Sequence, residues 1–288
     1  MIPGSFEYYR PASLSEAVGL LARLGEEARP LAGGHSLIPM MKLRMATPEH
    51  LVDLHGIADL KGIRQENGQV VIGAMTTQAE LIASDLLATH LPLLRETALL
   101  IADPQVRYLG TLGGNVANGD PGNDMPAVMM ALDASYQAVG VGGARDIPAR
   151  SFYQGAYFTA LEPGEMIASI SIPQPQAGNG AAYEKLKRKI GDYATAAAAV
   201  VLTRSEGRIT SCAIALTNVA DTPLLAEEAA QILIGSALDA ESVAKAVAAA
   251  ETITNPATDG RGTAAYRTKM AGIMLRRALA RAFERAAA

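Results

Sequence analysis

The stretch IPQPQAGNG, residues 172–180, constrains the fold most, because the chain follows a different pattern on each side of it. Two prolines and two glycines within nine residues are typical of a linker between folded units. Before this stretch, short strand and helix signals alternate; after it, strand signals come first and helix signals follow. The sequence therefore predicts an α+β protein with domains at residues 1–177 and 178–288.

The N-terminal part shows strand, turn, helix and strand signals in succession. Ser13 and Glu16 have the S-x-x-E spacing of a capping box and predict a helix that Gly25 ends. The stretch ARPLA is typical of a strand that runs into the turn GGHS, and a short helix is expected around Pro39. The stretch HLVDL predicts the next strand.

The middle of the chain continues this alternation. After the predicted strand VVIGA, Thr77 and Glu80 repeat the capping spacing before a short helix. The stretch LPLLRETALLIA predicts another helix, which Pro104 helps to end. The glycine-rich residues 110–123 predict a loop or a short strand, and Asp124 can begin the helix MPAVMMAL. Two further strands are expected at residues 134–140 and 165–172.

The second domain predicts an antiparallel sheet covered by helices. AAYEKLKRK alternates as a strand, and ATAAAAVVLT and ITSCAIALTNV flank RSEGR, which is typical of a hairpin turn. The alanines from Ala194 to Ala199 favour a helix by propensity, so a helix competes with the first hairpin strand. Three helices are expected near residues 224–235, 240–254 and 264–285.

Composition excludes several classes of function. The net charge of −4 argues against general nucleic-acid binding. The single cysteine, Cys212, cannot form an intrachain disulfide or hold an iron-sulfur cluster, and the four histidines lack metal-site spacing, so no metal is expected on this chain. No run reaches the roughly 18 apolar residues of a membrane span, and the start lacks a secretory pattern, so a cytoplasmic location is expected.

Adjacent glycines mark the candidate binding site. With 27 glycines in 288 residues, chance predicts about 2.5 adjacent pairs, so the three observed pairs are a weak signal by themselves. The pairs in AGGHS and TLGGN precede short polar side chains, whereas the pair in VGGAR suits a hairpin tip. Glycines let several backbone N–H groups converge on a diphosphate, so AGGHS and TLGGN are either anion cradles or ordinary tight turns. The G-x-G-x-x-G and P-loop motifs are absent.

The motifs AGGHSL, TLGGN, GNDMPA and KLKRKIGDYATAAAAVV together resemble the flavin-binding medium subunit of aerobic molybdenum-containing carbon monoxide dehydrogenases, within the xanthine dehydrogenase group. The resemblance covers essentially the whole chain. It implies a two-lobed FAD-binding domain of the vanillyl-alcohol-oxidase/PCMH type, with lobes at about residues 1–54 and 55–177. A C-terminal domain with a three-stranded antiparallel sheet and helices is implied as well.

The resemblance also implies which residues bind FAD. Two loops match the pyrophosphate-binding segments, while Asp124 matches an acid at the polar side of the flavin, Leu161 an apolar contact, Lys185 a nearby base and Tyr193 an aromatic ring over the isoalloxazine. Without the resemblance, Asp124 fits a helix cap equally well, and Leu161, Lys185 and Tyr193 fit a core leucine, a solvated lysine and a packed aromatic better than a binding site. The loop residues are Ala32, Gly33, Gly34, His35, Ser36, Thr111, Leu112, Gly113, Gly114 and Asn115.

In the implied enzyme, a large molybdenum subunit oxidises the substrate and a small subunit carries two 2Fe-2S clusters. This chain would pass electrons from the clusters through FAD to an acceptor such as quinone, without acid-base catalysis of its own. The implied assembly is a dimer of heterotrimers in the cytoplasm, peripheral at the inner membrane face. Three alternatives stay open: the flavin subunit of another molybdenum hydroxylase acting on xanthine, a heterocycle or an aryl thioester; a stand-alone flavoprotein reductase; and a docking subunit without flavin.

Positive charge gathers in two places. Residues 185–189 read KLKRK, and from Arg261 onward seven arginines and lysines accompany one acid, Glu284. These residues form either a solvated surface or a docking face for a partner.

Overall fold

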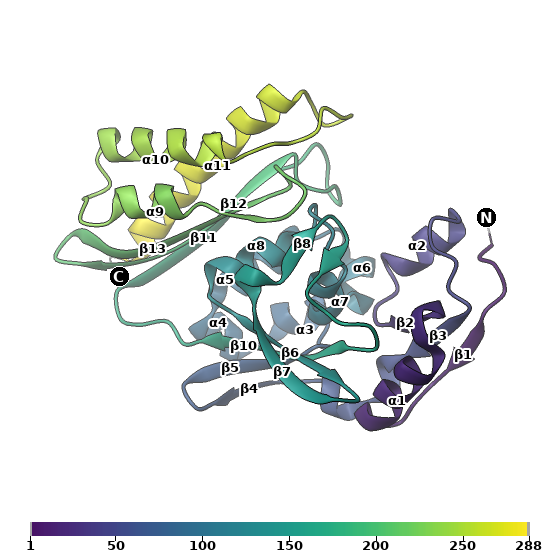
Figure 1. Ribbon diagram of the computed structural model, residues 1–288. Coiled ribbons are helices and arrows are strands. Elements are labelled where there is room, and N and C mark those ends of the chain that lie inside the picture. Colours follow the sequence, from purple (N-terminus) through teal and green to yellow (C-terminus); the bar gives the residue numbers. More distant parts are fainter. Residues whose placement is uncertain (1, 287–288) are drawn as a thin grey trace.

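The computed structural model describes residues 2–286, which form three main β-sheets with helices packed around and between them (Figure 1). The N-terminal lobe contains a parallel sheet in the order β1-β3-β2, and the side chain of Ser13 caps its first helix as predicted. Its elements are β1 (Glu7–Tyr9), α1 (Leu14–Leu24), β2 (Ala28–Leu31), α2 (Leu37–Lys42) and β3 (His50–Asp53).

The second lobe is built on a five-stranded antiparallel sheet in the order β4-β5-β10-β6-β7. Its strands are β4 (Ile63–Glu66), β5 (Gln69–Gly73), β6 (Ser135–Gly140), β7 (Gly143–Pro148) and β10 (Met166–Pro173), and β8 (Tyr153–Gly155) pairs separately with β9 (Phe158–Thr159). Its helices are α3 (Gln78–Ala83), α4 (Asp85–His90), α5 (Pro92–Leu100), α6 (Pro104–Leu109), α7 (Leu112–Ala117) and α8 (Asp124–Ala131).

The C-terminal domain contains an antiparallel sheet in the order β11-β12-β13-β14, in which a two-residue strand joins the three predicted ones. One face of this sheet packs against α9 and α11, and α10 packs against these two helices; the other face packs against α5 and α8 of the second lobe (Figure 1). The elements are β11 (Asn179–Leu186), β12 (Ala196–Ser205), β13 (Arg208–Thr217), β14 (Leu224–Leu225), α9 (Glu227–Leu233), α10 (Ala240–Thr252) and α11 (Ala264–Arg285).

The alanine-rich segment before Val200 forms a strand, although alanine favours helices. Alternate residues of β12 belong to two different hydrophobic cores, with Ala197 facing the second lobe and Ala198 facing the helices of its own domain. Both are fully buried, because helices lie close on both faces of the sheet. Small side chains allow this close packing, so tertiary contacts override the helix propensity.

Two predictions for the middle of the chain are wrong. Pro104 does not end a helix but occupies the first turn of α6, whose N-cap is Asp103. The stretch TLGGN is neither loop nor strand: Thr111 caps the helix α7, and its side chain accepts a hydrogen bond from the N–H of Gly114. The predicted hairpin tip in VGGAR is confirmed by the pairing of Gly140 with Gly143.

No helix within residues 2–286 is long and apolar enough to cross a membrane.

Candidate functional site

A cavity of about 460 Å³ is lined by residues from the N-terminal lobe, the second lobe and the C-terminal domain. All predicted binding residues line it except Leu112, whose side chain is fully buried in the core of the second lobe. Segments far apart in the sequence therefore meet at one cavity. The predicted residues on the wall are Ala32, Gly33, Gly34, His35, Ser36, Thr111, Gly113, Gly114, Asn115, Asp124, Leu161, Lys185 and Tyr193.

The first glycine loop joins β2 to α2 and offers unused backbone donors. Gly34 has φ +74°, a conformation that favours glycine. Gly33 lies so close to the backbone of Leu109 and Gly110 that a Cβ there would collide with it. Among residues 2–286, no acceptor is found for the N–H groups from Gly33 to Ser36. This loop can therefore bind an anion through its backbone.

The second glycine loop was predicted to offer free backbone N–H groups to an anion, but most of these groups are bonded within the protein. The N–H groups of Leu112 and Gly113 donate to the carbonyl oxygens of Thr76 (2.9 Å) and Ala74 (2.8 Å), and the N–H of Gly114 donates to Thr111. These amides are therefore occupied within the protein. The Thr111 hydroxyl accepts from Gly114 and keeps its own proton for donation to a ligand.

Several buried amide side chains on the cavity wall have no partner within the described part of the chain. Both amide atoms of Gln78, Oδ1 of Asn115 and Nδ2 of Asn118 are buried and lack a hydrogen bond. A buried polar group without a hydrogen bond lowers the stability of the protein by about 1–3 kcal/mol, so these atoms favour the binding of a polar ligand that pairs with them. With the free amides of the first loop, they fit a large cofactor that carries phosphates and many polar atoms.

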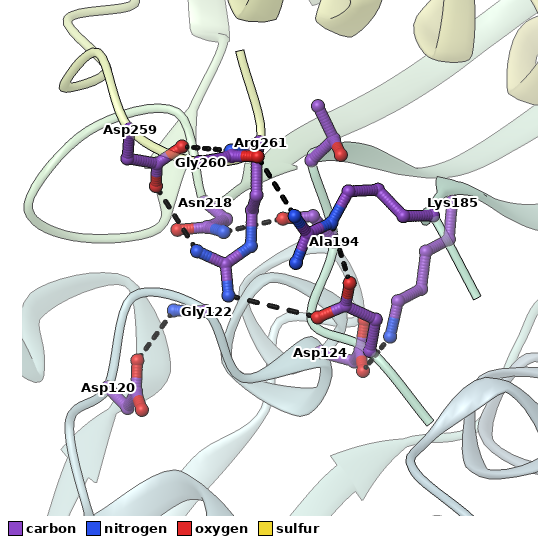
Figure 2. Close-up of polar contacts among 12 residues, drawn as sticks. Asp120, Gly122, Asp124, Lys185, Ala194, Asn218, Asp259, Gly260 and Arg261 are labelled. Atoms are coloured by element: carbon purple, nitrogen blue, oxygen red, sulfur yellow. Dashed lines mark hydrogen bonds and ion pairs between the residues drawn. The ribbon is translucent and has the colours of Figure 1, made fainter. Parts of the chain in front are cut away.

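A buried ion pair lies on the side of the C-terminal domain (Figure 2). Oδ2 of Asp124, in the first turn of α8, accepts from Nζ of Lys185 on β11 at 2.8 Å, and Oδ1 accepts from the hydroxyl of Tyr183 at 2.6 Å. The side chains of Asp124 and Lys185 are only 6% and 1% exposed. Burial makes such a pair strongly interdependent, since the loss of either partner leaves an uncompensated charge.

Tyr193 lies on a loop that several ion pairs hold in place. Its neighbour Asp192 contacts Arg188 at 2.9 Å and Arg261 at 3.9 Å, and the Arg261 guanidinium lies 5.7 Å from the centre of the Tyr193 ring. A Cβ on Gly122 would approach the Tyr193 ring to 2.7 Å, so the ring covers that glycine. Although Tyr193 is 42% exposed, partial desolvation of its phenol and the nearby Asp120 carboxylate raise its pKa, so the phenol stays protonated at neutral pH.

The sequence missed many residues of the wall. Gln78 follows the capping threonine of α3, and Asn118 belongs to the glycine-rich stretch that was predicted as a loop or a short strand. Five further members lie inside the quoted motifs AGGHSL, GNDMPA and KLKRKIGDYATAAAAVV but were not assigned to the site: Leu37, Gly122, Asn123, Gly191 and Asp192. The remaining members belong to none of these motifs. They are Arg29, Pro30, Leu54, Ala74, Met75, Ile101, Ala102, Val106, Gly110, Ala117, Glu165, Met166 and Ile167.

Most of the clustered basic residues contact the chain itself. Besides Lys185 and Arg188, Lys187 donates to the carbonyl of Leu100 at 3.3 Å. Arg267 is 3% exposed and donates to the carbonyls of Thr195 and Ala257. Further ion pairs hold Arg261, Lys269, Arg281 and Arg285. Much of this positive charge therefore stabilises the fold rather than forming a free docking face.

Two family models match the chain. The FAD-binding domain in molybdopterin dehydrogenase matches residues 4–175, and the CO dehydrogenase flavoprotein C-terminal domain matches residues 181–282. Together they account for both sides of the predicted linker.

Individual proteins agree with the family models. The carbon monoxide dehydrogenase medium chain of Afipia carboxidovorans is 68% identical, with 99% of each chain covered, and that of Hydrogenophaga pseudoflava is 52% identical, with 100% of each covered. A crystal structure of the Cu,Mo-CO dehydrogenase in its cyanide-inactivated form contains a chain with a TM-score of 0.98 and 68% identity, covering 99% of this chain and 100% of that one. The chain therefore belongs to the family of FAD-binding medium subunits of molybdenum-containing carbon monoxide dehydrogenases.

Proposed function

We propose that this chain binds FAD in the cavity and passes electrons from the 2Fe-2S clusters of a small partner subunit to an external acceptor such as quinone. The observation that carries this proposal is the meeting of two glycine motifs, about 80 residues apart, on one cavity wall with unpaired donors and acceptors. FAD supplies the chemistry, because it accepts electrons singly and can release them as a pair.

The side chains and amides of the wall would bind and orient the cofactor. The first loop, from Ala32 to Ser36, offers its backbone N–H groups to the diphosphate. The second loop offers the Thr111 hydroxyl and the side-chain amide of Asn115. Asp124 and Lys185 present fixed charges to the polar side of the flavin. Leu161 gives an apolar contact, and Tyr193 would cover one face of the ring. No side chain of this chain is assigned as an acid-base catalyst.

The substrate would be oxidised on another chain. We infer a large molybdenum subunit that oxidises carbon monoxide, and an assembly of two heterotrimers that works at the inner membrane face, where quinone is available. The 68% identity to a carbon monoxide dehydrogenase chain supports carbon monoxide as the substrate. The alternative is the flavin subunit of another molybdenum hydroxylase, which the identity of the large partner subunit would reveal.

His35 offers a direct test of the FAD site, because it lines the cavity and its side chain is exposed. His35→Asp places a negative charge beside the free amides of the first loop, whereas His35→Asn has the same shape without the charge. We expect the co-expressed complex with His35→Asp to retain at least about tenfold less FAD than that with His35→Asn, because like charges repel at the diphosphate. The ratio of visible flavin absorption to protein measures this.

The same complexes test the electron path. When the His35→Asp complex lacks FAD, carbon monoxide should still bleach the visible absorption of the iron-sulfur clusters, but quinone reduction should be lost. Equal FAD content in both variants would refute the site. Quinone reduction at the normal rate without FAD would refute the path through this chain.

A further inference from the structure

A buried tyrosine, Tyr183, lies next to the cavity wall but is not part of it. Neither the motifs nor the family resemblance assigns it a role. Tyr183 is 1% exposed and does not line the cavity. Its hydroxyl nevertheless donates to Oδ1 of Asp124 at 2.6 Å, and Asp124 does line the cavity. Tyr183 therefore contacts the carboxylate that faces the ligand without being positioned to touch the ligand itself.

The carboxylate of Asp124 is held by two donors from one strand. Tyr183 and Lys185 are two residues apart on β11, so both side chains lie on the same face of the sheet. Tyr183 donates to one carboxylate oxygen and Lys185 to the other, as Figure 2 shows for Lys185. A carboxylate has about four lone-pair positions, so acceptor capacity remains for a donor inside the cavity. Because each carboxylate oxygen is held by one donor, the plane of the Asp124 carboxylate is fixed, and so are the directions of its remaining lone pairs.

Tyr183 is itself held firmly. Its backbone N–H donates to Oε1 of Glu96 at 3.1 Å, and its hydroxyl lies 3.4 Å from Oγ1 of Thr217 on β13. Burial and the adjacent Asp124 charge raise the pKa of Tyr183 well above its usual value, so the phenol stays a proton donor. The other charged or titratable groups near Asp124 are Lys185, Lys187 and Tyr193.

We propose that Tyr183 is a positioning residue for the flavin: its hydroxyl orients the Asp124 carboxylate as an acceptor for an N–H donor of the bound isoalloxazine. This inference rests on the proposed FAD site. A purely structural tyrosine hydroxyl would affect folding stability alone. A positioning hydroxyl affects in addition the affinity for FAD and the visible absorption of the bound flavin, and does so through Asp124.

The expected effect follows from hydrogen bonding. Without the Tyr183 hydroxyl, the Asp124 carboxylate keeps Lys185 as its one donor from β11 and is no longer fixed in one orientation toward the cavity. FAD should therefore bind about tenfold more weakly to Tyr183→Phe than to the wild type, and the visible absorption of the bound flavin should shift, because its N–H donor loses a fixed acceptor.

The test uses the co-expressed complex with four variants of this chain: Tyr183→Phe, Asp124→Asn, both together, and Tyr136→Phe as the matched control. Tyr136 is also fully buried, and its hydroxyl bonds to that of Tyr153 at 2.8 Å away from the cavity wall. FAD dissociation is measured by flavin fluorescence, the bound flavin is recorded by its visible absorption, and melting temperature records stability. We expect weaker FAD binding and an absorption shift with Tyr183→Phe, neither with Tyr136→Phe, and no added effect of Tyr183→Phe in the Asp124→Asn background.

The outcomes separate the two proposals. If Tyr183→Phe behaves like Tyr136→Phe, or weakens FAD binding equally in the Asp124→Asn background, the positioning role is refuted and the FAD site stands. The same holds if Asp124→Asn leaves FAD binding unchanged. If the wild-type complex holds no FAD, the site itself is refuted. If the Tyr183→Phe chain does not assemble, 3-fluorotyrosine at position 183, a stronger donor of nearly the same shape, should change FAD affinity and the absorption of the bound flavin; unchanged values would refute the positioning role.

Discussion

At the scale of single residues, the glycines of the two motifs are required by the protein as well as by a ligand. A Cβ on Gly33 would collide with the Leu109 backbone, and one on Gly113 would collide with Ala74. Gly33 allows the first loop to pack against the backbone just before the second loop, and Gly113 allows α7 to pack against the backbone that follows β5. A substitution at Gly33 would therefore disturb the loops themselves, and His35 is the better probe of the anion site.

A second pair of side chains shows how one hydrogen bond can stabilise the N-terminal lobe. Asp53 at the end of β3 is 5% exposed, and it accepts from the hydroxyl of Tyr8 on β1 and from Nδ1 of His55 at 2.6 Å. Burial raises the pKa of Asp53, but the hydrogen bonds from Tyr8 and His55 outweigh it, and the net pKa is lowered. The ionised carboxylate thus links two strands and the turn that follows them.

We predict that Tyr8→Phe lowers the free energy of unfolding by about 1 kcal/mol at pH 7. Because the pKa of Asp53 is lowered by folding, its contribution is present above the unfolded value of about 4 and is lost as the pH falls through the folded value. The difference between variant and wild type should therefore shrink below about pH 4, as urea unfolding at several pH values would measure. Tyr9→Phe is the control, since that hydroxyl lies 3.5 Å from His50. A difference that is constant down to pH 2 would contradict the assignment.

At the scale of helices and strands, the C-terminal domain depends on one close contact. Helix α11 crosses β11 at Gly180, where a Cβ would collide with the carbonyl oxygen of Ala282 and approach the backbone nitrogen of Ala286 to 2.5 Å. Both are backbone atoms, so they cannot rotate away as a side chain could. The glycine sets how near the helix lies to the sheet.

We therefore predict that Gly180→Ala destabilises the protein by about 3 kcal/mol, measured by urea unfolding. Gly19→Ala in α1 is the matched control, because a Cβ there meets nothing within 4 Å and removes backbone freedom from the unfolded chain. We expect that control to stabilise by about 0.5 kcal/mol. Equal stability of the two variants would show that α11 can shift away from the sheet.

Local signals were sufficient to predict many elements but not the helix at TLGGN. The capping box at Thr77 and Glu80 is confirmed with both of its hydrogen bonds, because this motif satisfies its own backbone donors within four residues. The helix α7 contains two glycines, which disfavour helices, and it is held by bonds from Leu112 and Gly113 to residues more than 30 positions earlier. A local sequence pattern cannot reveal hydrogen bonds to residues so far away in the chain.

The candidate site was predictable to a different degree in each of its parts. The glycine motifs could be found because their backbone needs restrict the residue type, while Gln78 and Asn118 carry ordinary side chains whose importance comes only from burial at the cavity wall. Tyr183 could not be assigned at all, since its role depends on Asp124, 59 residues away in the chain.

At the scale of the whole molecule, the cavity depends on how the C-terminal domain sits against the second lobe. Lys185 and Tyr193 reach the wall from the C-terminal domain, so the site is incomplete without it. Glu96 on α5 is at the centre of this contact: Oε2 lies 2.7 Å from Arg285, and Oε1 lies 3.3 Å from Arg281 and accepts from the N–H of Tyr183. A single carboxylate thus connects α5 with both α11 and β11.

Glu96→Gln should therefore loosen the contact between the C-terminal domain and the second lobe. The amide keeps the shape but loses the charge that two arginines share, so we expect a loss of about 1–2 kcal/mol and a melting temperature lower by several degrees. The loss should shrink in high salt, because these side chains are partly exposed and salt screens their attraction. Glu241→Gln is the control: that residue contacts Lys245 at 2.7 Å on the exposed face of α10, where a pair contributes less than about 0.5 kcal/mol. If both variants melt alike, Glu96 does not hold the domain in place, and the packing of α5 and α8 against the sheet must do so alone.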